Sequence, residues 1–404
     1  MAHFGTDYAH RTELQGIAAL AAVATLIGIA FGLSTLITPL YVIYQRDFGF
    51  SQITLTLIYA AYALGNVAAL LFFGHVSDRA GRRLTALSAI VTLAAAALVF
   101  LFASNIAALY IARILTGLGI GVASGTGNAW LTELVDNQDK ARAATIGTTS
   151  NFVGLGVATL MSGLLAQYAP WPLRLSFVVY LFILCAAAAL IWFTRETVQG
   201  ARHADIRQIE LHPNLSLPRE IRGPFVAPAI TGFGLMALTG FYAALMPSTL
   251  SNDLQIKSHA AAGALFFELA AVVAVIIVVT QTLASRTAML ASLALMIPAA
   301  AALVATKVSA SLWVMLATTA IVAVSAGLGY RGSLQVVNQI APADKRAAVV
   351  SVYFICCFIG NALPVIGVGV LSSLTNATIA DIAFACLIAA FAAIALVFGL
   401  IYRR

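Results

Sequence analysis

The sequence predicts an all-α polytopic membrane protein whose twelve transmembrane helices form two pseudo-symmetric six-helix bundles. The first reason is its composition. Of its 404 residues, 61% are hydrophobic and only 9% are charged, against about 25% charged residues in a typical soluble domain. A soluble chain of this length could not hide so much apolar surface, whereas a bilayer accommodates it.

The apolar segments are the second reason. A helix needs about 20 predominantly apolar residues to cross about 30 Å of hydrocarbon. In chain order, the twelve runs that meet this need cover residues 16–44, 52–73, 84–104, 106–130, 143–168, 172–194, 224–251, 259–283, 287–306, 310–330, 346–372 and 376–401. Only Ser104 and Asn105 separate the third run from the fourth, so we expect a tight turn there.

The third reason is a single long polar segment, residues 195–223, which holds nine charged residues together with Pro213 and Pro218. It divides the chain into a first bundle, residues 1–194, and a second bundle, residues 224–404. Prolines and mixed charge favour a linker over a separate domain. We expect this linker to lie in the cytoplasm.

The two halves also share a worn internal repeat. Gly32 is followed seven residues later by Pro39, and Gly240 is followed seven residues later by Pro247. The loop before the fifth run reads D-K-A-R-A-A, and the loop before the eleventh reads D-K-R-A-A. Such a repeat relates the two bundles about an axis along the membrane normal.

Basic residues set the expected orientation. With the N-terminus inside, the cytoplasmic segments hold 17 of the 22 Lys and Arg residues. The outside loops hold four, which are Arg46, Arg174, Lys257 and Lys307. This asymmetry predicts a cell inner (plasma) membrane protein with both termini cytoplasmic. The net charge of +7 is therefore explained by topology, and we expect no nucleic-acid partner.

The most informative motif lies between the second and third runs. Residues 74–83 read G-H-V-S-D-R-A-G-R-R, which places an acid, three arginines and two glycines in a tight turn. This pattern resembles the signature loop between helices 2 and 3 of the major facilitator superfamily. The segment R-I-L-T-G from Arg113, with Gly121, is similar to the second motif of that family. The resemblance implies the major facilitator fold and a secondary transporter that works by alternating access.

The resemblance also implies a cytoplasmic gate. Asp78 would pair with Arg142 at the start of the fifth helix and lie near the positive N-terminal end of the eleventh. The gate would latch the outward-facing state, and its glycines would permit close backbone approach. The expected gate residues are Gly74, Asp78, Arg79, Gly81, Arg82, Arg83, Glu133 and Arg142.

Two charges inside the predicted spans are candidate proton-coupling residues, because charges in a bilayer are costly and usually functional. Arg113 matches an arginine that the family links to proton transfer; alternatively, it hydrogen-bonds carbonyl groups and ties helices together. Glu268 is the only carboxylate near the middle of a span. Ala261, Ala264 and Ala271 share its side, so we expect Glu268 to face the bundle or its cavity. Desolvation favours the protonated carboxyl, which makes Glu268 either a proton carrier or a permanently neutral structural group.

The fifth run bears on the mode of transport. Drug–proton antiporters of this family typically show G-x-x-x-G-P-x-x-G-G, whereas residues 154–163 read G-L-G-V-A-T-L-M-S-G. Small residues occupy the glycine positions of that pattern, but Thr159 stands in place of the proline. We interpret the chain as a proton-coupled exporter of a small organic solute, with uptake by symport or uniport as the alternative. The small residues equally allow helices 5 and 8 to pack closely.

Polar and aromatic residues near the middle of the spans are candidates for the substrate cavity, although each can instead make a helix–helix hydrogen bond. They are Tyr62, Asn66, Asn151, Tyr242, Tyr353 and Asn361. No catalytic cluster, metal-ligand spacing or G-x-x-x-x-G-K-[ST] loop is visible. We therefore expect no enzymatic activity, cofactor or metal, and a monomer whose partners are protons, the solute and lipid. A membrane sensor that does not transport is the remote alternative.

Overall fold

The computed structural model describes residues 13–73, 76–135, 139–198, 215–342 and 345–402. Within these ranges the structure is helical, and twelve helices are long and apolar enough to cross a membrane. The predicted fold class is therefore confirmed.

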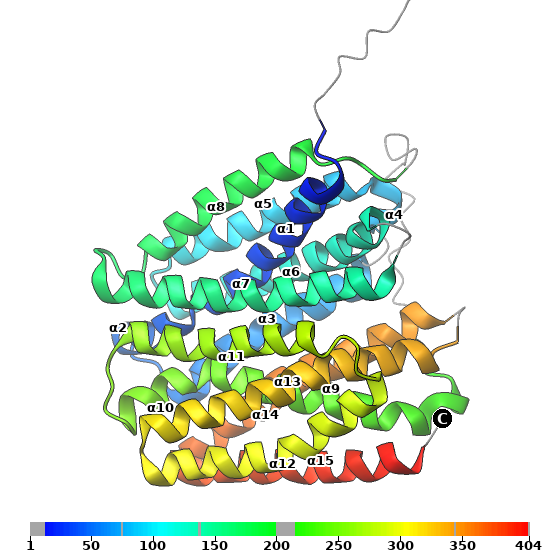
Figure 1. Cartoon of the computed structure of the whole chain (residues 1–404). Helices are drawn as coiled ribbons and strands as arrows, with labels where there is room; N and C mark the ends of the chain where they lie inside the picture. Colours follow the sequence, from blue (N-terminus) through cyan, green and yellow to red (C-terminus); the bar gives the residue numbers. More distant parts are fainter. Residues whose placement is uncertain (1–12, 74–75, 136–138, 199–214, 343–344, 403–404) are drawn as a thin grey trace, which may run out of the picture.

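The first six spans form one bundle, in the upper half of Figure 1. They are α1 (Gly16–Leu36) with η1 (Thr38–Leu40) and α2 (Tyr41–Phe48), then α3 (Gln52–Phe73), α5 (Arg82–Leu101), α6 (Ile106–Leu134), α7 (Lys140–Tyr168) and α8 (Leu175–Phe193). The short helix α4 (Val76–Ala80) lies in the turn between α3 and α5.

The last six spans form the second bundle, in the lower half of Figure 1. After η5 (Arg219–Ile221) they are α9 (Arg222–Ala244) with α10 (Met246–Asn252), then α11 (His259–Val279), α12 (Ser285–Ser309), α13 (Leu312–Ile340), α14 (Arg346–Leu374) and α15 (Ala377–Ile401). The bundles meet along two pairs of helices, α7 with α11 and α3 with α14.

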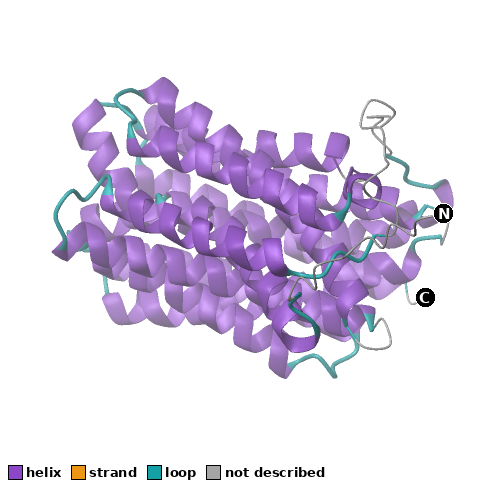
Figure 2. Cartoon of the chain, turned by 90° about the horizontal axis from the view of Figure 1, so that it is seen from above, coloured by secondary structure: helices purple, strands orange, loops and turns teal. Residues whose placement is uncertain are grey.

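The helices run roughly parallel to one another, and both ends of the chain lie at the same end of the molecule (Figure 2). We call this end, which also carries α4, the terminal face. The other end, which carries α2 and α10 in Figure 1, is the distal face.

The internal repeat appears as a matched break in two helices. Pro39 stands in the first turn of η1, directly after α1, and Pro247 stands in the first turn of α10, directly after α9. Proline is tolerated in a first helical turn because the N–H it lacks would have no partner there. The first and seventh spans are thus both interrupted at their distal ends.

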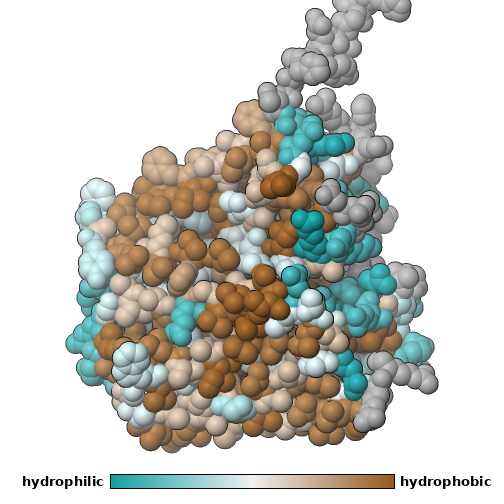
Figure 3. All heavy atoms as spheres, viewed as in Figure 1, coloured by the Kyte–Doolittle hydropathy of each residue, from teal (hydrophilic) through white to brown (hydrophobic). Residues whose placement is uncertain are grey.

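Large apolar side chains cover much of the side of the molecule. Val91, Phe182 and Val397, from three different helices, are all exposed. Figure 3 shows such residues (brown) between hydrophilic residues (teal) gathered at the two ends. An apolar surface of this extent suits contact with lipid chains.

Several helices are longer than the apolar runs predicted. The tenth span was expected to end at residue 330, but α13 continues to Ile340, so Arg331 lies within a helix rather than in a loop. The fifth span begins at Lys140 instead of residue 143. The length of an apolar run indicates which residues cross the hydrocarbon. The helix itself can continue beyond them, because its backbone hydrogen bonds do not depend on apolar side chains.

One very close helix crossing in the first bundle joins α3 to α6. A Cβ atom added at Gly65 would lie 2.1 Å from the carbonyl oxygen of Ile114, and one added at Gly117 would lie 1.9 Å from the carbonyl oxygen of Tyr62. The two backbones therefore touch, which small residues permit in membrane helices.

We expect Gly117→Ala to destabilise the protein by about 1–3 kcal/mol, since the added methyl group meets backbone that cannot rotate away. Thermal unfolding of the purified protein measures the loss. Gly125→Ala is the matched control on the same helix, because a Cβ there meets nothing within 4 Å. Equal melting temperatures for the two variants would contradict the close crossing.

A candidate transport cavity between the two bundles

A cavity of about 280 Å³ lies between the bundles. Its wall comes from α1, α3, α6 and α7 of the first bundle and from α9, α11, α13 and α14 of the second. Thr132, Lys140 and Asn338 line it at the terminal face, where Lys140 is exposed. The cavity therefore extends from the centre of the molecule to the terminal face.

Hydrogen bonds between the bundles close the inner end of this cavity. The phenol groups of Tyr59 and Tyr62 on α3 donate to Oδ1 of Asn361 on α14, at 3.0 and 2.8 Å. Within the second bundle, the Nδ2 group of Asn361 donates to the carbonyl oxygen of Met236 on α9, at 3.1 Å, which holds the amide in place. Farther toward the distal face, Oε1 of Gln167 accepts from the backbone N–H of His259 at 2.9 Å, which joins α7 to α11.

Two amide side chains of the cavity wall each hold one buried polar atom without a protein partner. Asn66 and Asn151 both line the wall and are only 1% and 5% exposed. Among the described residues, Nδ2 of Asn66 and Oδ1 of Asn151 have no hydrogen-bond partner. Buried polar groups are nearly always satisfied, so these two atoms are exceptions within the described part of the chain.

The rest of the wall combines aromatic, aliphatic and small polar side chains and carries little charge. In the described part of the chain, Lys140 at the mouth is the one charged lining residue. The aromatic residues of the wall are Phe31, Tyr59, Tyr62, Phe152, Phe266, Tyr330, Phe354 and Phe358. Such a surface suits a neutral solute that carries both apolar and hydrogen-bonding groups.

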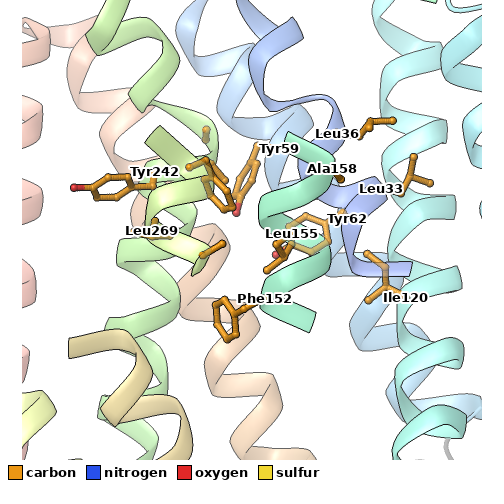
Figure 4. Packing of buried hydrophobic residues seen from close by; sticks show 14 of the residues in the cluster. Leu33, Leu36, Tyr59, Tyr62, Ile120, Phe152, Leu155, Ala158, Tyr242 and Leu269 are labelled. Carbon is orange, nitrogen blue, oxygen red and sulfur yellow. The ribbon is translucent and has the colours of Figure 1, made fainter. Parts of the chain in front are cut away.

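Four of the six predicted cavity residues lie on this wall: Tyr62, Asn66, Asn151 and Asn361. Tyr242 and Tyr353 do not, because both are buried in the second bundle. The hydroxyl of Thr319 donates to the phenol of Tyr242 at 3.1 Å, and the hydroxyl groups of Tyr353 and Ser333 are 2.7 Å apart. Figure 4 shows the Tyr242 phenol directed away from Tyr62 and Phe152.

Arg113 is fully buried behind the cavity and bonded to backbone. Its guanidinium donates to the carbonyl oxygens of Ser34 at 2.7 Å, Tyr59 at 3.0 Å and Ile58 at 3.4 Å. It also lies over the rings of Tyr59 and Tyr62, at 5.2 and 4.7 Å from their centroids. These contacts tie α1, α3 and α6 together, as the structural alternative for this residue expected.

Glu268 does not line the cavity. It is half-buried on α11, and Ala264 on the same side is exposed rather than packed in the bundle. Alanine is small enough for either environment, so the alanine face alone does not decide between the bundle interior and lipid. One carboxylate oxygen, Oε2, is nevertheless buried without a hydrogen-bond partner, and Glu268 interacts electrostatically with Tyr242.

The signature loop is organised around Arg82. Its guanidinium pairs with Asp78 at 2.6 Å and makes a two-pronged contact with Glu133, at 2.6 and 3.3 Å. Arg83 pairs with Glu13 at 3.0 Å. The ion pair described for Asp78 is thus within its own loop, whereas Arg142, its expected partner, is exposed on the first turn of α7.

Of the two glycines in the predicted gate, Gly81 lies within the described residues. Gly81 precedes α5 with φ 95° and ψ 150°, a conformation essentially restricted to glycine. Gly74 lies outside the described residues. Arg79 lies in the last turn of α4.

Glu196 is a residue of this region that the sequence analysis missed. Its two carboxylate oxygens accept the backbone N–H groups of Arg82 and Arg83 at 3.0 and 2.9 Å. A carboxylate at a helix N-terminus satisfies free N–H groups and complements the helix dipole. The sequence shows that Glu196 is charged, but it does not show that the segment after α8 packs beside the start of α5.

A second missed cluster lies at the distal face. Lys307 at the end of α12 pairs with Asp253, after α10, at 2.5 Å and with Asp381 of α15 at 3.1 Å. All three side chains are largely buried. The sequence analysis placed Lys307 in an outside loop and did not pair it.

A family model described as Major Facilitator Superfamily matches residues 20–365 of the sequence. The chain belongs to the Major Facilitator Superfamily. The fold of this facilitator is similar to two crystal structures of a bacterial homologue to the human lysosomal transporter Spinster, both inward-facing. The unoccupied form has a TM-score of 0.70 and 18% identity over 95% of this chain and 97% of that one. The occupied form has a TM-score of 0.70 and 17% identity over 95% of each chain.

One curated relative of the facilitator is the arabinose-proton symporter of Bacillus subtilis (strain 168). It is 30% identical over 115 residues, which are 28% of this chain and 25% of the relative. The matched segment therefore spans about a quarter of that symporter. As a multi-pass member of this superfamily, the protein is a membrane transporter.

We expect Arg82→Gln to destabilise the facilitator by about 1.5–3 kcal/mol, because it removes the charged hydrogen bonds to Glu133 and Asp78. Arg142→Gln is the matched control, since Arg142 is exposed, and should change stability by no more than about 0.5 kcal/mol. Melting curves followed by intrinsic fluorescence compare the two. A smaller loss for Arg82→Gln than for Arg142→Gln would show that the loop is anchored elsewhere.

Proposed function

We propose that this facilitator exports a small, neutral organic solute by alternating access and couples export to protons. The observation that carries the proposal is the cavity, whose wall is uncharged except at its mouth and which is open at one face. The excess of basic residues near the terminal face supports a cytoplasmic assignment for that face and for both termini. In the proposal the protein lies in an inner (plasma) membrane, and the cavity loads from the cytoplasm.

The solute class follows from the cavity wall. No carboxylate lines the cavity in the described part of the chain, so a strongly cationic solute would find no counter-charge. Asn66 and Asn151 offer both donor and acceptor groups, and the aromatic residues offer apolar faces. A neutral solute with hydroxyl or amide groups on an apolar frame fits this combination best.

Uptake by proton symport is the second candidate. The similarity to the arabinose-proton symporter supports it, over the 115 matched residues. Proteoliposomes with an imposed pH gradient distinguish the two directions. Solute accumulation on the acidic side supports export by exchange for protons, whereas accumulation on the alkaline side supports symport.

Glu268 is the residue we propose for proton coupling. Arg113 is committed to three carbonyl groups, whereas one oxygen of Glu268 is buried without a partner beside Tyr242. An unpaired buried charge is costly, so a change in water access to Glu268 during transport would change its occupancy by a proton. In this proposal, the gain and loss of a proton by Glu268 couple the movement of the solute to the movement of protons.

We expect Asn66→Leu and Asn151→Leu each to weaken solute binding by about 2- to 10-fold per hydrogen bond lost. The solute is first identified by screening a metabolite and drug panel in proteoliposomes. Equilibrium binding to the purified variants then gives the dissociation constants. Tyr353→Phe is the control, because its hydroxyl group lies away from the cavity. If both Asn variants bind the solute as tightly as wild type, the amides do not contact it.

We expect Glu268→Gln to abolish accumulation driven by a pH gradient while preserving downhill exchange, because the amide cannot release a proton. Glu220→Gln, at an exposed acid outside the cavity, is the matched control. Transport is measured with and without the gradient. A Glu268→Gln protein that still concentrates solute as wild type does would sink the coupling role.

A further inference from the structure

A second hollow lies between α7 and α11, on the side of the molecule. It measures about 560 Å³, and its described wall is apolar apart from Thr149. Val153 and Val157 of α7 and Val275 and Val278 of α11 belong to this wall and are all exposed. The hollow therefore opens among side chains that face lipid, and we call it the lateral crevice.

Small residues bring α7 and α11 close together on the distal side of the crevice. Near the distal face the two helices are in backbone contact, since a Cβ added at Gly163 would lie 3.1 Å from the Cα atom of Gly263. At Gly156 the added atom would meet the Cβ of Ala270 at 2.9 Å. Toward the terminal face, valines together with Ala271 and Ala274 form the wall of the crevice.

Phe152 forms the partition between the crevice and the central cavity. It lines both hollows and is 2% exposed. Its ring packs edge to face against Tyr330, at 5.7 Å between centroids, and Tyr330 also lines the cavity. Asn151, with its unpartnered amide oxygen, is the neighbouring residue on the cavity side. Phe152 is thus the described residue that the walls of the two hollows share.

We propose that the lateral crevice binds the hydrocarbon chain of a single-chain amphiphile whose neutral polar head occupies the central cavity. This inference rests on the proposed function and narrows its solute class. The exposed valines of the rim face lipid, so the molecule that reaches the crevice from outside is a hydrocarbon. Phe152 acts as the lateral gate between them.

The hydrocarbon chain and the polar head are expected to contribute differently to the binding free energy. A chain that moves from lipid into an apolar crevice leaves one apolar surrounding for another, so it gains little. The polar head gains hydrogen bonds from the amide groups of Asn66 and Asn151 on the cavity wall. Affinity therefore resides in the cavity, whereas the crevice accommodates the chain and provides access from the membrane.

Photo-crosslinking in lipid nanodiscs tests the proposal without requiring transport. The probe is a dodecyl glucoside with a diazirine in its chain, and the hexyl homologue is the short-chain comparison. We expect the dodecyl probe to label residues 149–157 and 267–279 at least about tenfold more than exposed stretches of α5 and α15, an affinity difference of about 1.4 kcal/mol. Even labelling of all lipid-facing helices would overturn the proposal.

Variants distinguish labelling at a specific binding site from labelling by the surrounding lipid phase. Ala271→Phe and Val275→Phe fill the crevice and should each remove most of its labelling, whereas Val91→Phe, on the exposed face of α5, should not. Two such variants guard against the misfolding of one. Asn151→Leu should also lower crevice labelling, because it releases the head group. Labelling that survives Asn151→Leu and both filling variants would identify bulk lipid and contradict the proposal.

The proposed function is checked separately. Wild type and Ala271→Phe are compared for transport of a water-soluble solute found in the panel screen. Unchanged transport together with lost labelling supports the lateral crevice as an independent route. Failure of wild type to transport any solute would overturn the proposed function, and the labelling pattern would still decide the crevice.

Discussion

The architecture of the first bundle depends on one cation held in the membrane by backbone. Arg113 can be buried because carbonyl oxygens of α1 and α3 accept its N–H groups. They are within reach because Gly65 and Gly117 let α3 and α6 touch. The same side chain lies against Tyr59 and Tyr62, which bind Asn361 of the other bundle. A buried cation thus orients the residues that close the inner end of the cavity.

The fold was predictable because the bilayer imposes a simple rule. Any backbone within it must be hydrogen-bonded internally, so long apolar runs become helices, and all twelve were found. The rule does not apply outside the hydrocarbon. For this reason the polar end of α13, including Arg331, was assigned to a loop. The matched prolines Pro39 and Pro247 located the two broken spans, because proline acts through local geometry that sequence reveals directly.

The site was predictable only in part, because residue type does not determine direction. Asn66 and Asn361 line the cavity, whereas Tyr242 and Tyr353, equally polar and equally central, are bonded to hydroxyl groups within the second bundle. Helical periodicity gives a face but not the neighbour opposite it. Glu268, for example, lies outside the cavity wall, although one of its carboxylate oxygens is buried. Glu196 shows the same limit at long range, since its role depends on a chain segment folding back onto α5.

The contacts between the bundles differ in kind from those within them. The ion pairs described each join residues of one bundle, such as Arg82 with Glu133 or Lys307 with Asp381. The bundles themselves are joined by neutral donors and acceptors, at Asn361 and Gln167. Each such hydrogen bond contributes only about 0.5–1.5 kcal/mol and is not screened by salt as exposed charge pairs are. Water can replace these bonds one by one as the bundles part. Among the described residues, the side-chain contacts that must break when one half moves against the other are therefore uncharged, and we expect their loss to depend on hydration more than on ionic strength.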